Sequence, residues 1–401
     1  MIVKGVVVLK KVYLFVGTLS GGGAERAVSN ISMNLNDDIK RDIILFGDSA
    51  SLNYPYSGEI IYLDEMKLST LPKKLLALWY RSKKIKDLKK RETTTISFLE
   101  YPNLINCLTR KHGKSIVSVR NHMSTKYKRG LKSVFWNNTI KRLYSKTDQI
   151  IAVSYEIKKD LVKNYDINPE KVSVIYNSYP IESIQKLSKY GVEDEYSSLF
   201  NHPVIITAGR LNEQKGQWHL LRAFKKVKED IKDAKLVFLG EGDLQKYLAQ
   251  LAKDLGIDKD VYFLGFQENP FKYIEKSTLF VMSSLYEGFP NALAEAMACG
   301  IPVISSDCLS GPREIIAPNE IDKEDVNYDI VEKRFGVLTP VCDGIRYTSK
   351  DRLTKEEIMM ANHMITLLEN KELTKHFSKQ SLTRITDFNI KNVIKQWERL
   401  I

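Results

Sequence analysis

The sequence has few cysteines and no long apolar run. Its four cysteines lie far apart, and none belongs to a CxxC pair or has a histidine cluster beside it. This spacing argues against a disulfide framework and against structural zinc, and it is typical of a reducing cytoplasm. No apolar run approaches the roughly 20 residues of a membrane-spanning helix. Lys4, Lys10 and Lys11 interrupt the apolar N-terminus, so we expect a short leader and a buried first strand rather than a secretory signal.

Acidic residues are outnumbered by basic ones. The chain has 61 lysines and arginines against 49 aspartates and glutamates, a net charge of +12. Such an excess favours anionic partners, which include nucleic acid, phosphorylated ligands and anionic lipid. No recognised nucleic-acid motif accompanies the charge, so a nucleic-acid-binding protein is the weaker alternative and we expect no nucleic-acid partner. Hydrophobic residues make up 43% of the 401 positions, which indicates a folded chain long enough for two domains.

Short apolar segments alternate with amphipathic ones, which predicts strand–helix units and parallel sheets. In the first half, we expect strands at residues 12–16, 41–46, 95–98, 115–119, 149–153 and 171–175. A polar stretch at residues 177–202 is expected to be a linker. The pattern then restarts, with expected strands at residues 203–208, 235–239, 261–264, 278–282 and 301–305. The last expected helix, near residues 390–400, carries apolar side chains that need a surface to pack on.

The predicted fold class is therefore α/β, with two tandem Rossmann-like, doubly wound parallel-sheet domains. A ligand cleft is expected between them, at the carboxyl ends of the strands. The expected domains cover residues 1–180 and 181–385, and residues 386–401 are expected to form a helix that crosses back to the first domain.

A glycine-rich segment, Gly-Thr-Leu-Ser-Gly-Gly-Gly-Ala-Glu at residues 17–25, follows the first expected strand and opens a helix. Glycines let a ligand approach the backbone, and a helix N-terminus favours an anion. The spacing is not GxGxxG, and Gly23 stands where a P-loop needs lysine. The plain alternative is a tight strand–helix turn, but three consecutive glycines exceed what a turn needs. We expect Gly22, Gly23 and Glu25 to lie near a ligand.

Two cations, Arg210 and Lys215, follow the first strand of the second half, just before a helix. Arginine offers a planar fork and lysine a point charge, and helix amides can add to both in a diphosphate site. The plain alternative is a solvated loop with ordinary surface charges.

The most specific segment is Glu-Gly-Phe-Pro-Asn-Ala-Leu-Ala-Glu-Ala-Met-Ala-Cys-Gly at residues 287–300. Pro290 suits a first helical turn, and the amides there can face a phosphate. Glu287 and Glu295 can accept hydrogen bonds from sugar hydroxyls. Elsewhere two glutamates eight apart would indicate only a solvated helix face, but the glycine, proline and strand around them favour a site.

Together, the segments 21–25, 209–216 and 287–300 resemble the retaining nucleotide-sugar glycosyltransferases of family 4 (group 1), which have the GT-B fold. The likeness covers nearly the whole chain and rests on a Glu-x7-Glu motif. It implies that the first domain binds the acceptor and the second the nucleotide sugar. It also implies that Arg210 and Lys215 hold the donor diphosphate and stabilise the leaving group, while Glu287 binds the donor sugar. The implied donor-binding residues are Gly22, Gly23, Gly209, Glu241, Phe266, Gly288, Phe289, Asn291, Ala292, Leu293 and Glu295.

Such enzymes need no metal and no other cofactor. The pair Asp258 and Asp260 does match the DxD metal motif of another glycosyltransferase fold, but it falls in a polar turn where surface aspartates are common. Many relatives carry a histidine at a strand end of the first domain. Here Arg120 and Asn121 lie nearest that strand end and His122 is offset, so we expect Asn121 or His122 to line the cleft.

Two basic stretches lie in the first domain. Residues 72–91 carry nine lysines and arginines, and residues 124–146 carry seven, both interleaved with apolar and aromatic residues. This composition predicts docking on an anionic membrane surface, although each apolar side could equally be core. Many relatives extend polyprenyl-diphosphate sugars for capsule or lipopolysaccharide.

We therefore predict a cytoplasmic enzyme, peripheral at the inner face of the membrane. It would transfer a hexose or N-acetylhexosamine from a nucleotide sugar, with UDP the commonest nucleotide among relatives, to a lipid-linked saccharide or glycan. A nucleotide-sugar epimerase or a phosphorylase of the same fold is the alternative.

Overall fold

The computed structural model describes residues 10–47, 52–64, 70–127 and 131–401. The expected leader, and Lys128 and Arg129 of the second basic stretch, lie outside the described residues. The chain divides into two compact units. The N-terminal unit comprises Met1–Ser178 with Ile390–Ile401, and the C-terminal unit comprises Tyr179–Asn389.

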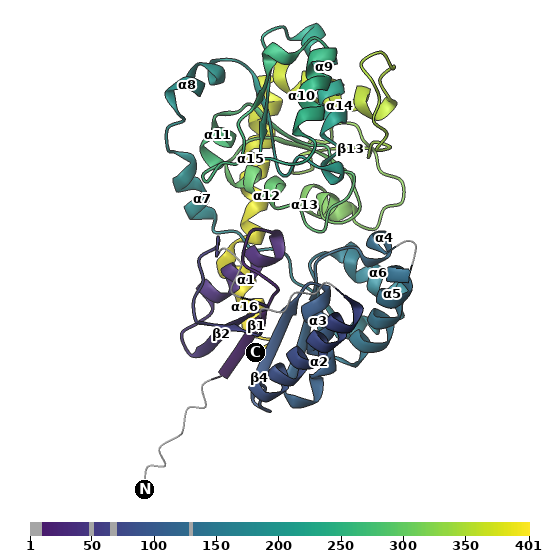
Figure 1. Cartoon of the computed structure of the whole chain (residues 1–401). Coiled ribbons are helices and arrows are strands. Elements are labelled where there is room, and N and C mark those ends of the chain that lie inside the picture. The colour runs from purple at the N-terminus through teal and green to yellow at the C-terminus, as the bar shows by residue number, and fades with distance from the viewer. Residues whose placement is uncertain (1–9, 48–51, 65–69, 128–130) are drawn as a thin grey trace. The chain divides into compact units, whose positions relative to one another are not determined.

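The N-terminal unit is built on a parallel sheet with the strand order β3-β2-β1-β4-β5-β6-β7. Its described strands are β1 Lys10–Phe15, β2 Ile39–Leu45, β3 Glu59–Tyr62, β4 Thr93–Phe98, β5 Lys114–Val119, β6 Gln149–Ala152 and β7 Val172–Val174. The helices are α1 Gly23–Asn34, α2 Leu71–Leu88, α3 Glu100–Leu108, α4 Met123–Lys126, α5 Leu131–Leu143, α6 Tyr155–Tyr165 and α16 Ile390–Glu398 (Figure 1).

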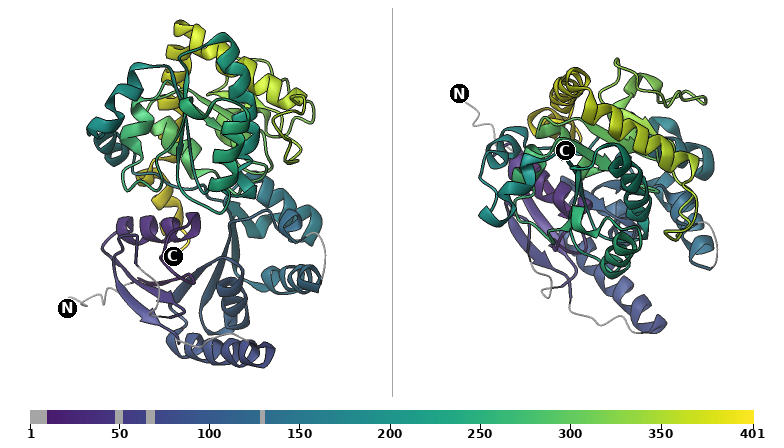
Figure 2. Two further views of the ribbon diagram at one scale, coloured as in Figure 1. Left: turned by 45° about the horizontal axis from the view of Figure 1, so that its top comes forward. Right: turned by 90° about the horizontal axis from the view of Figure 1, so that it is seen from above.

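Alternate residues of the central strands point to opposite faces, which gives this sheet two apolar layers. Val12 and Leu14 of β1 pack with α1 and α16, whereas Tyr13 and Phe15 pack with α2 and α3. Figure 2 shows α1 and α2 on opposite sides of this sheet. The apolar surface that the last helix needs is thus the core of the N-terminal unit, where Trp397 is buried against Phe98.

The C-terminal unit has a parallel sheet with the order β10-β9-β8-β11-β12-β13. Its described strands are β8 Val204–Ala208, β9 Lys235–Leu239, β10 Val261–Phe263, β11 Leu279–Met282, β12 Val303–Ser306 and β13 Val337–Thr339. The helices are α7 Ile181–Ser188, α8 Asp194–Ser197, α9 Gln217–Asp230, α10 Gln245–Asp254, α11 Phe271–Lys276, α12 Asn291–Ala298, α13 Pro312–Ile316, α14 Lys355–Glu369 and α15 Lys371–Ile385.

Local sequence explains why these elements form. The strands β4 and β12 are buried at every position and rich in β-branched residues, as parallel strands covered on both faces require. A capping box starts α14: the hydroxyl of Thr354 accepts the amide of Glu357, and the Glu357 carboxylate accepts the amide of Thr354.

The expected linker at residues 177–202 is wrong, because α7 and α8 form there and belong to the C-terminal unit. Ile181, Ile184 and Leu187 follow one another at helical spacing, and the first two are buried. Farther along, the Glu193 carboxylate accepts hydrogen bonds from Lys272 and Tyr273. The helix α7 was not predicted because polar residues separate its three apolar positions.

Candidate active site

The loop that carries Arg210 and Lys215 follows β8 and is hydrogen-bonded to the carboxyl end of β9. Strand β8 ends at Ala208, and the Gly209 amide donates to the Leu239 carbonyl at 2.9 Å. The Leu211 amide donates to the Glu241 carbonyl at 2.9 Å. A Cβ added at Gly240, whose φ is +124°, would collide with the Gly209 carbonyl. The two loops therefore approach at backbone distance, which only glycine permits at this position.

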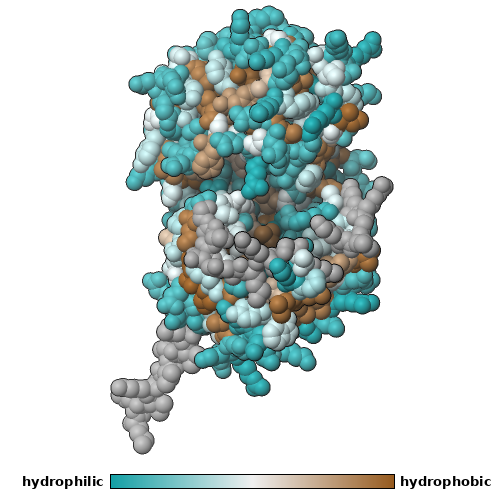
Figure 3. All heavy atoms as spheres, in the orientation of Figure 1, coloured by the Kyte–Doolittle hydropathy of each residue, from teal (hydrophilic) through white to brown (hydrophobic). Residues whose placement is uncertain are grey.

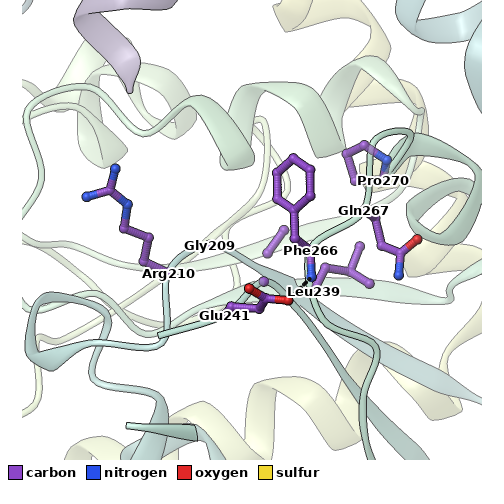
Figure 4. Close-up of a pocket in the computed structure, with 9 residues that line it drawn as sticks. Gly209, Arg210, Leu239, Glu241, Phe266, Gln267 and Pro270 are labelled. Atoms are coloured by element: carbon purple, nitrogen blue, oxygen red, sulfur yellow. Dashed lines mark hydrogen bonds between the residues drawn. The ribbon is translucent and has the colours of Figure 1, made fainter. Parts of the chain in front are cut away.

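A cavity of about 360 Å³ opens beside these loops. It is lined by Ala208, Gly209, Arg210, Leu239, Gly240, Glu241, Phe266, Gln267 and Pro270. In Figure 4, Arg210 and the Phe266 ring extend from neighbouring loops toward the same side, with Glu241 between their bases. The Phe266 amide donates to the Glu241 carboxylate at 3.4 Å, and the Phe266 side chain is 73% exposed. A flat ring standing exposed at a pocket is a surface on which a planar ligand can stack.

Lys215 and Glu287 form a close ion pair. The Lys215 Nζ lies 2.6 Å from Glu287 Oε1, and the two side chains are 19% and 7% exposed. The same carboxylate accepts the Ser284 hydroxyl at 2.7 Å and the Gln214 amide at 3.2 Å. Gln214 also donates to the Tyr286 carbonyl at 2.9 Å. Two segments 72 residues apart are thus locked into one charged cluster at the carboxyl ends of β8 and β11.

The start of α12 is fixed by contacts on several sides. The Asn291 Oδ1 accepts the Tyr179 hydroxyl at 2.8 Å, and the Gly288 carbonyl accepts the Ser310 hydroxyl at 2.5 Å. The Phe289 ring packs edge-on against Phe388. Because Phe289 and Leu293 are buried, these two can offer a ligand only their backbone groups. Glu295, one turn into the helix, is also buried.

In the N-terminal unit, the carboxylate of Glu25 lies beside Gly22 at the start of α1. Gly22 is the N-cap of α1, and Gly23 is its first residue. The Glu25 Oε1 accepts the Thr18 hydroxyl at 3.4 Å, and its Oε2 lies 2.5 Å from where a Cβ of Gly22 would stand. A carboxylate over the start of a helix satisfies the positive end of the dipole. The expected preference for an anion is therefore opposed here by the charge of Glu25.

The strand-end residues 120–122 hold three different partners. Arg120 donates to the Asn177 side chain and lies 5.9 Å from the Phe98 ring centre. Asn121 donates to Glu100 Oε1 at 3.3 Å. His122 Nδ1 lies 3.6 Å from the buried Asp160 carboxylate, which also accepts the amides that follow the histidine.

One of the two DxD aspartates is paired with lysines. Asp258 and Asp260 lie in one 3₁₀ turn, and Asp260 pairs with Lys235 at 2.6 Å and Lys228 at 2.9 Å. Burial raises the pKa of Asp260, but the hydrogen bonds from Lys235 and Lys228 outweigh it and lower that pKa overall. No cluster of three or more His, Cys, Asp or Glu side chains suited to a metal occurs among the described residues.

The chain matches two family models, "Glycosyltransferase Family 4" over residues 21–183 and "Glycosyl transferases group 1" over residues 195–327. It is 31% identical to the N-acetylgalactosamine-N,N'-diacetylbacillosaminyl-diphospho-undecaprenol 4-alpha-N-acetylgalactosaminyltransferase of Campylobacter jejuni, over 95% of this chain and 96% of that one. An uncharacterized glycosyltransferase of Methanocaldococcus jannaschii is 39% identical over 72% of this chain and 71% of its own length.

The chain belongs to the family 4 glycosyltransferases of group 1. The fold agrees with this assignment. The crystal structure of Anabaena HepE in complex with UDP and glucose matches 97% of this chain and 98% of that chain with a TM-score of 0.73 at 18% identity. The two parallel sheets are the two Rossmann-like domains of the GT-B fold. The family models and the glycosyltransferase relatives show that the chain is a transferase of class EC 2.4.

The glycosyltransferase structure brings six of the predicted residues together in two groups within the C-terminal unit. Gly209, Arg210, Glu241 and Phe266 share the cavity, and Lys215 meets Glu287. Ser284 and Gln214, which hold Glu287, were not among the predicted residues. Both lie within three residues of a predicted one, but only the folded loops show that they point at the carboxylate.

Glu100 and Asp160, which contact Asn121 and His122 in the N-terminal unit, were also not among the predicted residues. Glu100 follows the strand β4, so the rule that ligands meet the carboxyl ends of parallel strands could have selected it. Asp160 lies inside α6, and nothing in its local sequence distinguishes it from a solvated helix residue. Only the fold shows that it faces His122.

Proposed function

We propose that this glycosyltransferase moves a hexose or N-acetylhexosamine from a UDP-sugar to a lipid-linked saccharide, with retention of configuration and without a metal ion, in the assembly of a cell-surface polysaccharide. The observation that carries the proposal is the Lys215–Glu287 pair. Its lysine lies on the same loop as Arg210, and the lysine stem packs beside Gly209, which lines the cavity of Phe266. One cluster thereby combines cations for a diphosphate with a carboxylate for sugar hydroxyls.

The residue types suit departure of a nucleoside diphosphate. Arg210 offers a fork that binds phosphate oxygens in pairs, and Lys215 adds a point charge. Preorganised cations in a partly buried site stabilise the charge that develops on the leaving group, the role that a metal ion has in other enzymes. The amides at the start of α12 can add to them, while Glu287 and Glu295 accept hydroxyl donors.

The donor and the acceptor are inferred from the pocket and from the relatives. The exposed Phe266 ring supplies a stacking surface of the size of a nucleobase. HepE is described with UDP, and the name of the Campylobacter relative specifies a diphospho-undecaprenol acceptor. We therefore assign a uridine nucleotide to the cavity and a polyprenyl-diphosphate saccharide to the N-terminal unit.

A nucleotide panel tests this proposal. We expect UDP and at least one UDP-sugar to raise the Tm of the protein, whereas ADP and GDP do so weakly, and EDTA should leave the shift unchanged. A ligand at 100 times its Kd stabilises a folded protein by about 2.7 kcal/mol, which is easily measured by differential scanning fluorimetry. A folded protein that responds to none of these nucleotides, or one whose activity disappears with EDTA, would contradict the proposal.

The basic stretches support a position at the inner face of the membrane. On α2, Leu75, Leu76 and Trp79 are 60%, 57% and 63% exposed, although Ala77 and Ile85 of the same helix are buried. The apolar residues of α2 therefore do not all belong to the core. Exposed lysines accompany them, at Lys73, Lys74, Lys83 and Lys86. Figure 3 shows apolar side chains among hydrophilic ones on this part of the N-terminal unit.

A second group of the same kind lies on α5, where Val134 and Phe135 are exposed and Phe135 contacts Trp136 edge-on. Apolar side chains that enter the headgroup layer, together with cations worth about 1 kcal/mol each near an anionic leaflet, would hold the enzyme peripherally. Among the described residues, no helix is both long and apolar enough to cross a bilayer.

Replacing Leu75, Leu76 and Trp79 together by serine should lower binding to vesicles of 30% anionic lipid at least tenfold in a sedimentation assay. The shift in Tm with UDP should not change, because these residues lie outside the donor site. Ile358→Ser, at an exposed position of α14, is the matched control. Unaltered vesicle binding by the triple variant, or retention on heparin without retention on vesicles, would contradict membrane docking through α2.

A further inference from the structure

The sheet of the N-terminal unit has its topological switch point between β1 and β4. From β1 the chain proceeds to β2 and β3 on one side, and β4 to β7 follow on the other. In such sheets, ligands bind outside the carboxyl ends of the strands at the switch point. The helix that follows each of these strands has a glutamate in its first turn: Glu25 in α1 after β1, and Glu100 in α3 after β4.

The backbone just before Glu100 is strained. Leu99 has φ 70° and ψ 167°, a conformation that residues with a side chain rarely adopt. It persists only where the surrounding structure imposes it, and such strain clusters at ligand sites. The consequence is that Glu100 becomes the first residue of α3, at the carboxyl edge of the sheet.

The Glu100 carboxylate is satisfied on one oxygen only. Its Oε1 accepts Lys126 Nζ at 2.7 Å and Asn121 Nδ2 at 3.3 Å. Its Oε2 accepts no hydrogen bond from any residue that the structure describes and is reached by solvent, on a side chain that is 12% exposed. A carboxylate has about four acceptor positions, so one that is fixed through one oxygen and open to solvent at the other can receive a donor from a ligand.

We propose that Glu100 is an acceptor-binding residue, whose Oε2 accepts a hydrogen bond from a hydroxyl of the acceptor saccharide, with Asn121 and Lys126 as the positioning residues that orient it. This inference rests on the proposed function. The Lys126 ammonium balances the charge of Glu100, and an ionised carboxylate accepts hydrogen bonds and donates none. The free oxygen therefore suits a sugar hydroxyl of the acceptor and not its diphosphate, whose ionised oxygens are also acceptors.

The experiment compares Glu100→Ala and Glu100→Gln in the full chain with the wild type. The acceptor probes are octyl glycosides of glucose, galactose, N-acetylglucosamine and N-acetylgalactosamine, and the best wild-type acceptor is used for kinetics. For Glu100→Ala we expect the acceptor KM to rise ten- to a hundredfold. Glu100→Gln, which keeps a carbonyl acceptor, should recover part of that loss. Hydrolysis of the donor by water and the shift in Tm with UDP should stay within twofold. Glu156→Gln, at a glutamate paired with Lys159 on α6, is the matched control.

Each other outcome overturns the inference. If transfer and donor hydrolysis fall together in Glu100→Ala, Glu100 has a structural role. If the acceptor KM of Glu100→Ala stays within twofold of the wild-type value, Glu100 does not bind the acceptor. If no glycoside is an acceptor, saturation-transfer NMR on the UDP-bound enzyme measures binding instead, and wild-type protein that binds none of the four also contradicts the inference. Failure of the proposed function is distinguishable, because then even the wild type shows no shift with UDP and no donor hydrolysis.

Discussion

Replacing Glu287 by alanine is expected to lower kcat/KM for sugar transfer about a thousandfold while the protein stays folded. The carboxylate is almost fully buried and receives donors from Lys215, Ser284 and Gln214, so it is held in one orientation before the substrate arrives. Removing a single preorganised electrostatic contact typically costs a factor of about 10²–10³ in rate. The loss here should reach the upper end, because the variant also leaves the Lys215 ammonium without its counter-charge.

The affinity for UDP separates this effect from general damage. Glu287 is assigned to the donor sugar, so UDP without a sugar should bind the Glu287→Ala variant within about threefold of wild type, as titration calorimetry can measure. Glu287→Gln keeps the shape but not the charge and should retain only a small part of the activity. Glu229→Ala, at an exposed position of α9, should behave like the wild type. Transfer at a wild-type rate by Glu287→Ala would remove this residue from the mechanism.

Most strands could be predicted from their apolar residues, including the three-residue strands β7 and β10, whereas β3 and β13 could not. The expected strand at residues 235–239 is β9, because all of its inner positions are apolar. The strand β3 was missed because it lies at the sheet edge, where its four residues are only partly covered and show no buried run. The strand β13 was missed because Gly336 and Pro340 flank its three residues like a turn, and its place is fixed by pairing with β12.

In the site, too, features that depend on nearby residues could be predicted, and contacts between distant segments could not. Glycines and charges at strand ends are local signals, and they selected Arg210, Lys215 and Glu287. The pairing of Lys215 with Glu287 is not local, because it depends on β8 and β11 lying side by side in the sheet. The position of the Glu25 carboxylate beside Gly22 is likewise not a local signal, because it depends on the rotamer of one side chain. The predicted ligand contact at Gly22 and Gly23 stays a prediction.

Lys215→Ala should have a different signature from Glu287→Ala, although the two side chains touch. We expect transfer to fall about a thousandfold and UDP affinity to fall at least tenfold, because the ammonium is assigned to the diphosphate as well as to Glu287. Uridine lacks the diphosphate and should bind both proteins equally. The ratio of UDP to uridine affinity is therefore the decisive measurement, and Lys225→Ala, at a partly exposed lysine of α9, serves as the control.

We expect Lys215→Arg not to retain the transfer activity of the wild type. The lysine stem packs against Gly209, where an added Cβ would lie 3.1 Å from Lys215 Cε, and the wider guanidinium would have to displace that loop. The Lys215→Ala, Glu287→Ala double variant measures the coupling between the two residues. If the two residues act in one charged cluster, its loss of transfer will be much smaller than the product of the two single losses. An unchanged ratio of UDP to uridine affinity in Lys215→Ala would instead mean that this lysine only supports Glu287, and the diphosphate contact would pass to Arg210 and the amides of α12.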